Sequence, residues 1–220
     1  MESSTHEDES PIPLGALRRL MPNWLKHFLP SGGGRAHDEH GKSMFGFTVF
    51  LLSESVVFIS FFVTYITLRL TTLHWLPPGV KGPDLSTAVM INSVVLVSSS
   101  FVIQAAEGAL KNGNLSRFRL LWLTTSAMGI FFLVGEVREW LGLDFGLSTG
   151  LVGGTFYLLT GFHGLHVFTG IVLQMIMFVR SFIPGNYDQG DFGVSAATLF
   201  WHFVDVIWVI LFSLIYLWRA

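Results

Sequence analysis

The stretch 44–68 reads MFGFTVFLLSESVVFISFFVTYITL and holds one acidic or basic side chain, Glu54, in 25 residues. At a rise of about 1.5 Å per residue, a helix of this length crosses the roughly 30 Å of hydrocarbon in a lipid bilayer. In lipid every backbone polar group must be paired within the protein. The stretch therefore predicts a membrane-spanning helix.

Four further apolar stretches repeat this pattern, at about 88–110, 118–141, 151–179 and 196–218. Turn-forming residues separate them, beginning with Pro77-Pro78-Gly79 and ending with Pro184-Gly185-Asn186. The sequence therefore predicts an all-α protein, with residues 44–220 forming one integral membrane bundle of five transmembrane helices.

The composition agrees with a membrane protein. Hydrophobic residues make up 51% of the 220 and charged residues only 13%, about half the share in a soluble domain. The net charge of −2 gives no basic field for nucleic acid, so no nucleic-acid partner is expected. The chain has no cysteine, which excludes disulfides and thiolate metal sites.

Residues 1–43 are expected to form a cytoplasmic, partly disordered N-terminal segment, because they are polar and acidic at their start. Nine of the 13 Lys and Arg residues fall on the N-terminal side of the predicted spans. Cytoplasmic loops carry the excess of Lys and Arg, so the N-terminus is predicted to be cytoplasmic.

Glu54 is the most informative polar residue, because it lies near the middle of the first span with no Lys or Arg within a helical turn. A charge at the bilayer centre costs about 2.5–3.5 kcal/mol on insertion scales. We therefore expect Glu54 to be largely neutral. It would serve either as a proton-exchanging group or as a hydrogen-bond donor to another helix.

Two histidines in the fourth span, His163 and His166, are three residues apart and are predicted to share one helix face. Such a pair could ligate a metal or a haem, but hydrogen bonding between helices is the simpler interpretation, and no metal site is predicted. Small residues nearby, including Gly164, favour the close approach of another helix.

Two more polar groups lie in or beside spans. In the fifth span, His202 and Asp205 are three residues apart, so the carboxylate can pair with the imidazole as a proton relay, a lipid-headgroup anchor or a buried clasp. At the outer end of the third span lie Glu136, Arg138 and Glu139, where Arg138 can neutralise one carboxylate. These polar residues are predicted to make lipid or interhelical contacts.

Taken together, the motifs resemble one family, cytochrome c oxidase subunit III. Residues 154–167, GTFYLLTGFHGLHV, are similar to the family's first signature, and residues 201–208, WHFVDVIW, to its second. Glu139-Trp140 resembles the acidic–aromatic pair that precedes the first signature, and Glu54 falls where the family keeps an intramembrane glutamate. The resemblance covers about 44–218.

The resemblance implies a subunit of an aa3-type oxidase that holds no haem or copper, since these belong to subunits I and II. It would pack on subunit I, bind phospholipid, and support proton uptake and stable turnover in aerobic respiration, with cytochrome c as the electron donor of the complex. Glu54 would be the family's carbodiimide-reactive carboxyl. The host would be a bacterial plasma membrane or a thylakoid membrane.

The chain departs from the longest family members in three ways. It lacks the first two of seven spans, Ser195 replaces the usual acidic residue before the last span, and Glu136 stands where glutamine is common. Related alternatives are subunit III of a quinol oxidase and an accessory subunit of a nitric-oxide reductase. Different classes are a haem-carrying electron-transfer protein that uses His163, His166 and His202, and a proton-coupled transporter that uses Glu54.

Overall fold

The computed structural model describes residues 36–183, 187 and 191–218, with side chains from Lys42 onward. The predicted N-terminal segment, 1–43, lies largely outside the described residues. The elements are the helices α3 (Ala36–Thr71), α4 (Thr87–Lys111), α5 (Leu115–Gly142), α6 (Gly150–Arg180) and α7 (Phe192–Phe212), and the π-helix η1 (Ser213–Leu217).

These elements confirm the predicted all-α fold. Five helical stretches are long and apolar enough to cross a membrane: Lys42–Thr71, Thr87–Lys111, Leu115–Gly142, Gly150–Arg180 and Phe192–Leu217, where α7 continues into η1. The described residues include no strand. The chain divides inside α3 into two compact units, Met1–Val49 and Phe50–Ala220, and every contact given below lies within the second unit.

Local sequence explains where several helices begin and end. The Ser86 hydroxyl accepts a hydrogen bond from the backbone N–H of Val89 at the start of α4, and the Asn114 side chain accepts one from Arg117 at the start of α5. Both side chains satisfy backbone donors that a helix leaves unpaired at its first turn. Gly113 has φ +74° in the tight turn between α4 and α5, a conformation that favours glycine.

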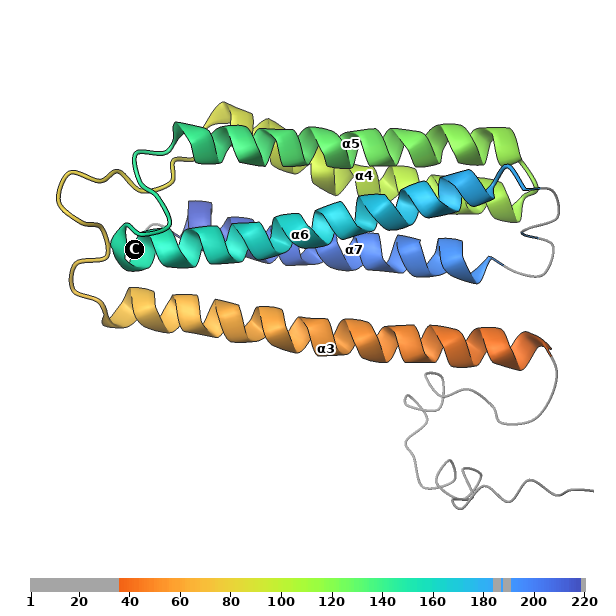
Figure 1. Cartoon of the computed structure of the whole chain (residues 1–220), viewed down its shortest axis with the longest axis horizontal. Coiled ribbons are helices and arrows are strands. Elements are labelled where there is room, and N and C mark those ends of the chain that lie inside the picture. The colour runs from red at the N-terminus through yellow and green to blue at the C-terminus, as the bar shows by residue number, and fades with distance from the viewer. Residues whose placement is uncertain (1–35, 184–186, 188–190, 219–220) are drawn as a thin grey trace, which may run out of the picture. The chain divides into compact units, whose positions relative to one another are not determined.

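Within the second unit, α4, α5, α6 and α7 form a four-helix bundle in which α4 packs on α5, α5 on α6, α6 on α7 and α7 on α4. Figure 1 shows α4 and α5 in one layer and α6 and α7 in the next. The part of α3 after Val49 reaches α6 and α7 through aromatic side chains. The Phe58 ring lies 5.2 Å from that of Phe162 and 6.1 Å from that of Phe203.

The tightest packing surrounds Trp201 of α7, which is fully buried. Its indole occupies a slot between two glycines: a Cβ added to Gly129 of α5 would lie 2.6 Å from the ring, and one added to Gly170 of α6 would lie 2.8 Å from it. The indole N–H donates to the Ser99 hydroxyl of α4 at 2.8 Å. One side chain thus joins all four helices of the bundle.

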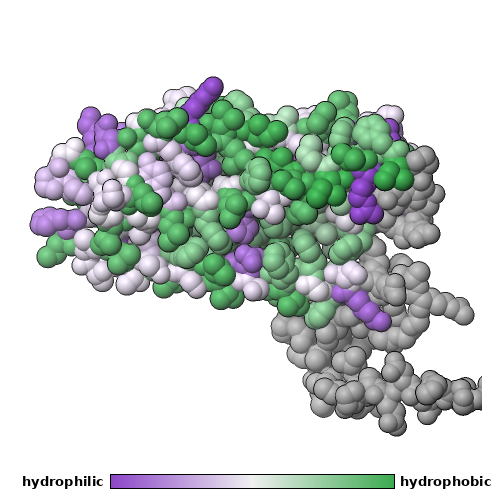
Figure 2. Space-filling model, in the orientation of Figure 1, coloured by the Kyte–Doolittle hydropathy of each residue, from purple (hydrophilic) through white to green (hydrophobic). Residues whose placement is uncertain are grey.

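The surface is that of a membrane protein. Hydrophobic side chains cover much of the visible face in Figure 2. The exposed hydrophobic side chains of α3 include Leu52, Val56, Ile59 and Val63, all more than half exposed. A monomeric soluble protein rarely exposes so continuous an apolar stripe, so this face is suited to lipid or to a partner protein.

Candidate functional site

Glu54 and His166 form a polar pair between α3 and α6. Glu54 Oε2 lies 3.3 Å from His166 Nε2, and the two side chains are 23% and 11% exposed. The imidazole is surrounded by rings, with Phe58 at 5.0 Å and Phe162 at 4.8 Å between centroids. The pair therefore lies in an apolar environment that opens partly towards the surface.

A hydrogen bond between these two side chains requires a proton on one of the two facing atoms. His166 Nδ1 lies 2.8 Å from the Phe162 carbonyl, which can only accept, so Nδ1 carries a hydrogen. Nε2 of a neutral ring is then an acceptor, and a hydrogen bond to Glu54 needs a protonated carboxyl. If the ring is charged instead, Nε2 donates to a carboxylate. In both arrangements one proton lies between Glu54 and His166.

His163 lies apart from that pair, although the spacing predicted that both histidines share one face. Its ring is fully buried, stacks on Trp208 of α7 with centroids 4.9 Å apart, and meets the edge of Phe132 of α5. Residues three apart on a helix differ by about 60° in direction. That difference is enough to turn His163 towards α5 and α7 and His166 towards α3.

No metal centre is found in the described part of the chain, where no three His, Cys, Asp or Glu side chains lie close enough to hold an ion. His163, His166 and His202 are not brought together around one site. Two of these imidazoles have polar partners on other helices: His166 contacts Glu54 of α3, and His202 contacts Gln104 of α4.

His202 and Asp205 of α7 are connected through a residue that the sequence did not indicate. The Ser100 hydroxyl of α4 lies 3.0 Å from His202 Nδ1 and donates to Asp205 Oδ2. His202 Nε2 lies 3.1 Å from Gln104 Oε1, also on α4. The expected pairing of carboxylate and imidazole is therefore bridged by a serine, because both side chains lean towards α4.

The acidic end of α5 is more buried than its sequence suggests. Glu136 is only 3% exposed, and a Cβ on Gly164 of α6 would lie 3.1 Å from Glu136 Oε2. Glu139 accepts a 2.6 Å hydrogen bond from the Tyr216 hydroxyl of η1, whereas Arg138 is exposed. Because α5 continues to Gly142, Glu136 lies well inside the helix on a packed face.

Ser195 has a partner at the start of α7. Its hydroxyl donates to Glu107 Oε1 of α4 at 2.8 Å, and Lys111 donates to the same oxygen at 2.6 Å. An acidic side chain at position 195 would meet the Glu107 carboxylate. Serine in place of the usual acidic residue therefore fits the acidic neighbour that this chain presents.

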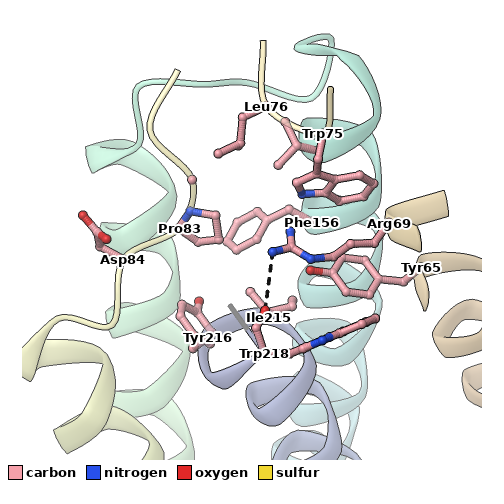
Figure 3. A pocket seen from close by; sticks show the side chains of 12 residues that line it. Tyr65, Arg69, Trp75, Leu76, Pro83, Asp84, Phe156, Ile215, Tyr216 and Trp218 are labelled. Atoms are coloured by element: carbon pink, nitrogen blue, oxygen red, sulfur yellow. Dashed lines mark hydrogen bonds between the residues drawn. The ribbon is translucent and has the colours of Figure 1, made fainter. Parts of the chain in front are cut away.

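A cavity of about 280 Å³ lies where α3 ends, at a position that no sequence motif predicted. Figure 3 shows Arg69 pointing into it between the indoles of Trp75 and Trp218. The guanidinium lies 5.4 Å and 5.9 Å from these two ring centroids and donates to the Trp218 carbonyl at 3.4 Å. Only the presence of tryptophan and arginine near the ends of spans could have indicated it.

A second hollow is an apolar groove of about 620 Å³ between α4 and the α7–η1 segment. Its lining includes Val94, Val97 and Phe101 from α4, and Val209 and Phe212 from α7. A groove of this composition suits a hydrocarbon chain or an apolar helix.

Five spanning helices, with ionisable side chains paired between them, define a multi-pass helical membrane protein. The family model described as "Cytochrome c oxidase subunit III" matches residues 19–220. The chain is 43% identical over 189 residues to the "Cytochrome c oxidase subunit 3" of Synechocystis sp. (strain ATCC 27184 / PCC 6803 / Kazusa), covering 84% of this chain and 80% of that protein.

Other proteins named "Cytochrome c oxidase subunit 3" are similar to this chain over most of its length. The protein of Thermostichus vulcanus is 44% identical over 183 residues, covering 83% of this chain and 90% of its own length. The human protein is 32% identical over 181 residues, covering 80% and 69%. The chain belongs to the cytochrome c oxidase subunit III family. This family supplies a subunit of an oxidoreductase, the haem–copper oxidase, and associates with its subunits I and II.

Proposed function

We propose that this chain is subunit III of an aa3-type cytochrome c oxidase. It has no redox role of its own, packs on subunit I, binds phospholipid, and sustains proton uptake and stable turnover. Haem and copper belong to subunits I and II, and cytochrome c delivers the electrons. Membership of the family supports assembly with subunits I and II, and the Glu54–His166 pair supports a role in proton uptake.

The observation that carries the proposal is the contact between Glu54 and His166 on a weakly covered helix. A hydrogen bond between these side chains requires a proton on Glu54 or on His166 Nε2, and Glu54 is 23% exposed. A group in apolar surroundings that is reachable from outside can exchange its proton without unfolding the bundle. Glu54 is therefore the side chain of this chain best placed to accept and release protons during turnover.

Phospholipid binding is supported by two features. At the end of α3, Arg69 presents a cation between Trp75 and Trp218, a combination suited to the phosphate level of a bilayer. The apolar groove between α4 and α7 can take an acyl chain, because Val94, Phe101 and Phe212 line it. The chain is inserted in a plasma membrane or a thylakoid membrane, and its N-terminus is on the cytoplasmic side.

Carbodiimide labelling tests the role of Glu54. Carbodiimides modify protonated carboxyls in apolar surroundings, so the purified complex should be labelled on this chain and Glu54→Gln should abolish that labelling. Glu139→Gln is the matched control, because this carboxyl is bonded to Tyr216 and should not be the labelled group. The assignment to Glu54 is wrong if Glu54→Gln is labelled as strongly as the wild type.

The same preparation tests the identity of the complex. A cytochrome c oxidase should oxidise reduced cytochrome c and contain a large haem–copper subunit beside this chain. Oxidation of quinol alone would identify a quinol oxidase, and reduction of nitric oxide a nitric-oxide reductase. A haem band that remains with this chain after it is separated from its partners would contradict a subunit without a redox centre.

A further inference from the structure

A continuous string of polar side chains crosses the α4–α7 contact, separate from the Glu54–His166 pair. It runs from Gln104 Oε1 to His202 Nε2 at 3.1 Å, from His202 Nδ1 to the Ser100 oxygen at 3.0 Å, and from the Ser100 hydroxyl to Asp205 Oδ2. All four residues lie well inside the spans Thr87–Lys111 and Phe192–Leu217.

The direction of each hydrogen bond follows from the chemistry of its ends. Because the Ser100 hydroxyl donates to Asp205, its oxygen accepts from His202 Nδ1. Gln104 Oε1 can only accept, so His202 Nε2 also carries a hydrogen. The string in this arrangement consists of an imidazolium, a neutral hydroxyl and a carboxylate.

A second arrangement contains the same number of protons. The Nδ1 proton of His202 passes to the Ser100 oxygen while the hydroxyl proton of Ser100 passes to Asp205 Oδ2. One N–H and one O–H bond break and two O–H bonds form, leaving a neutral imidazole and a neutral carboxyl. No charge is then left in the membrane interior, where an isolated ion is costly, and every hydrogen bond of the string is kept.

We propose that Asp205, Ser100 and His202 form a proton relay inside the membrane. Serine lies between the acid and the imidazole, so its hydroxyl transmits a proton and is not arranged as a nucleophile, which would need the imidazole in the centre. The relay goes beyond the proposed function and does not depend on it, because it uses other helices and needs no redox partner.

The two ends of the relay differ in access. Asp205 is 4% exposed, and its Oδ1 is buried with no hydrogen-bond partner among the described residues. His202 is half-buried, and Gln104 is exposed on the surface of α4. Exposed polar groups in a span normally face a partner protein or water, so protons enter at the His202 end and reach Asp205 through Ser100.

Infrared spectroscopy of the purified complex with the full chain tests the relay. A carboxyl C=O band that is lost in Asp205→Asn identifies the protonated acid, and transfer into D2O shifts that band as its proton exchanges. Ser100→Ala should slow this exchange by about 10-fold or more, because exchange then requires local opening of the bundle. Ser100→Thr keeps the hydroxyl and should restore the wild-type rate.

Ser98→Ala is the matched control, because the Ser98 hydroxyl bonds to the Val95 carbonyl of its own helix and lies outside the string. Exchange should be unchanged in this variant. His202→Phe interrupts the relay at its half-buried end, so it tests the proposal even if Ser100→Ala does not assemble. Wild-type exchange in His202→Phe or in assembled Ser100→Ala, or the absence of an Asp205 band, would overturn the relay.

Discussion

Helices α3 and α7 each carry a carboxyl group deep in a span, yet they are packed very differently. In an apolar stretch of 18 residues from each span, 22% of the residues are buried inside the protein for Lys42–Thr71 and 50% for Phe192–Leu217, which consists of α7 and η1. Asp205 of α7 is 4% exposed beside the fully buried Trp201. Glu54 of α3 is 23% exposed and bonds to a single imidazole of the neighbouring helix.

These two helices show two ways in which the protein accommodates a carboxyl group within a membrane span. In the four-helix bundle, Asp205 is enclosed and reached only through other side chains. On α3, Glu54 keeps partial access to the outside, and rings such as Phe58 shield its partner. A tightly packed helix can hold a fixed polar network, whereas a loosely packed helix can expose an exchangeable group.

The largest expected effect concerns the packing of α7. Trp201→Ala empties the slot between Gly129 and Gly170 and should destabilise the bundle by about 3–5 kcal/mol, the usual cost of removing a buried large aromatic side chain. Thermal unfolding of the purified complex measures it. Leu165→Ala, at a residue 57% exposed on α6, should change stability by about 0.5 kcal/mol or less. Equal effects in the two variants would show that α7 is not the centre of packing.

A smaller and more local effect is expected on α3. Phe58→Ala removes a fully buried ring that contacts α6 and α7, and it should weaken the attachment of α3 by about 3 kcal/mol. Hydrogen–deuterium exchange should become faster in 50–71 while α4 to α7 stay protected. Val56→Ala, at a residue 62% exposed on the same helix, is the control and should leave exchange unchanged. Faster exchange throughout the bundle would mean that α3 is part of one cooperative core.

The smallest effect concerns the end of α3. Arg69→Ala removes the contacts with Trp75 and Trp218 and should cost about 1 kcal/mol, the sum of two modest cation–π contacts. The change should appear as faster hydrogen exchange over 66–71 alone. Arg138→Ala, on the exposed side of α5, should leave that segment unaffected. If the two variants behave alike, the aromatic contacts of Arg69 do not hold the end of α3.

The fold could be predicted from the sequence because hydropathy is a local property. Each apolar run long enough to cross a bilayer is a helix in the structure. Glu54 could be identified for the same reason, since a carboxyl group in the hydrocarbon interior of a membrane is costly wherever its partner lies. Partners were harder to predict, because Ser100 is more than one hundred residues from His202 and Asp205, and many serines lie in α4.

The sequence also could not predict which neighbouring helix each side chain faces. The spacing of His163 and His166 fixes their relative angle but not which helices occupy the two directions. The burial of Glu136 follows from the approach of Gly164, which no local pattern reports. The slot between Gly129 and Gly170 was not predicted either, because no local pattern shows that one indole fills the space between two glycines on different helices.

The slot around Trp201 also sets an order of assembly. Gly129 and Gly170 belong to helices that are synthesised before α7, so both walls of the slot exist before its occupant leaves the ribosome. The four-helix arrangement can therefore close only after the last membrane segment has been inserted. A chain halted before residue 192 would lack the indole that fills the space between Gly129 and Gly170.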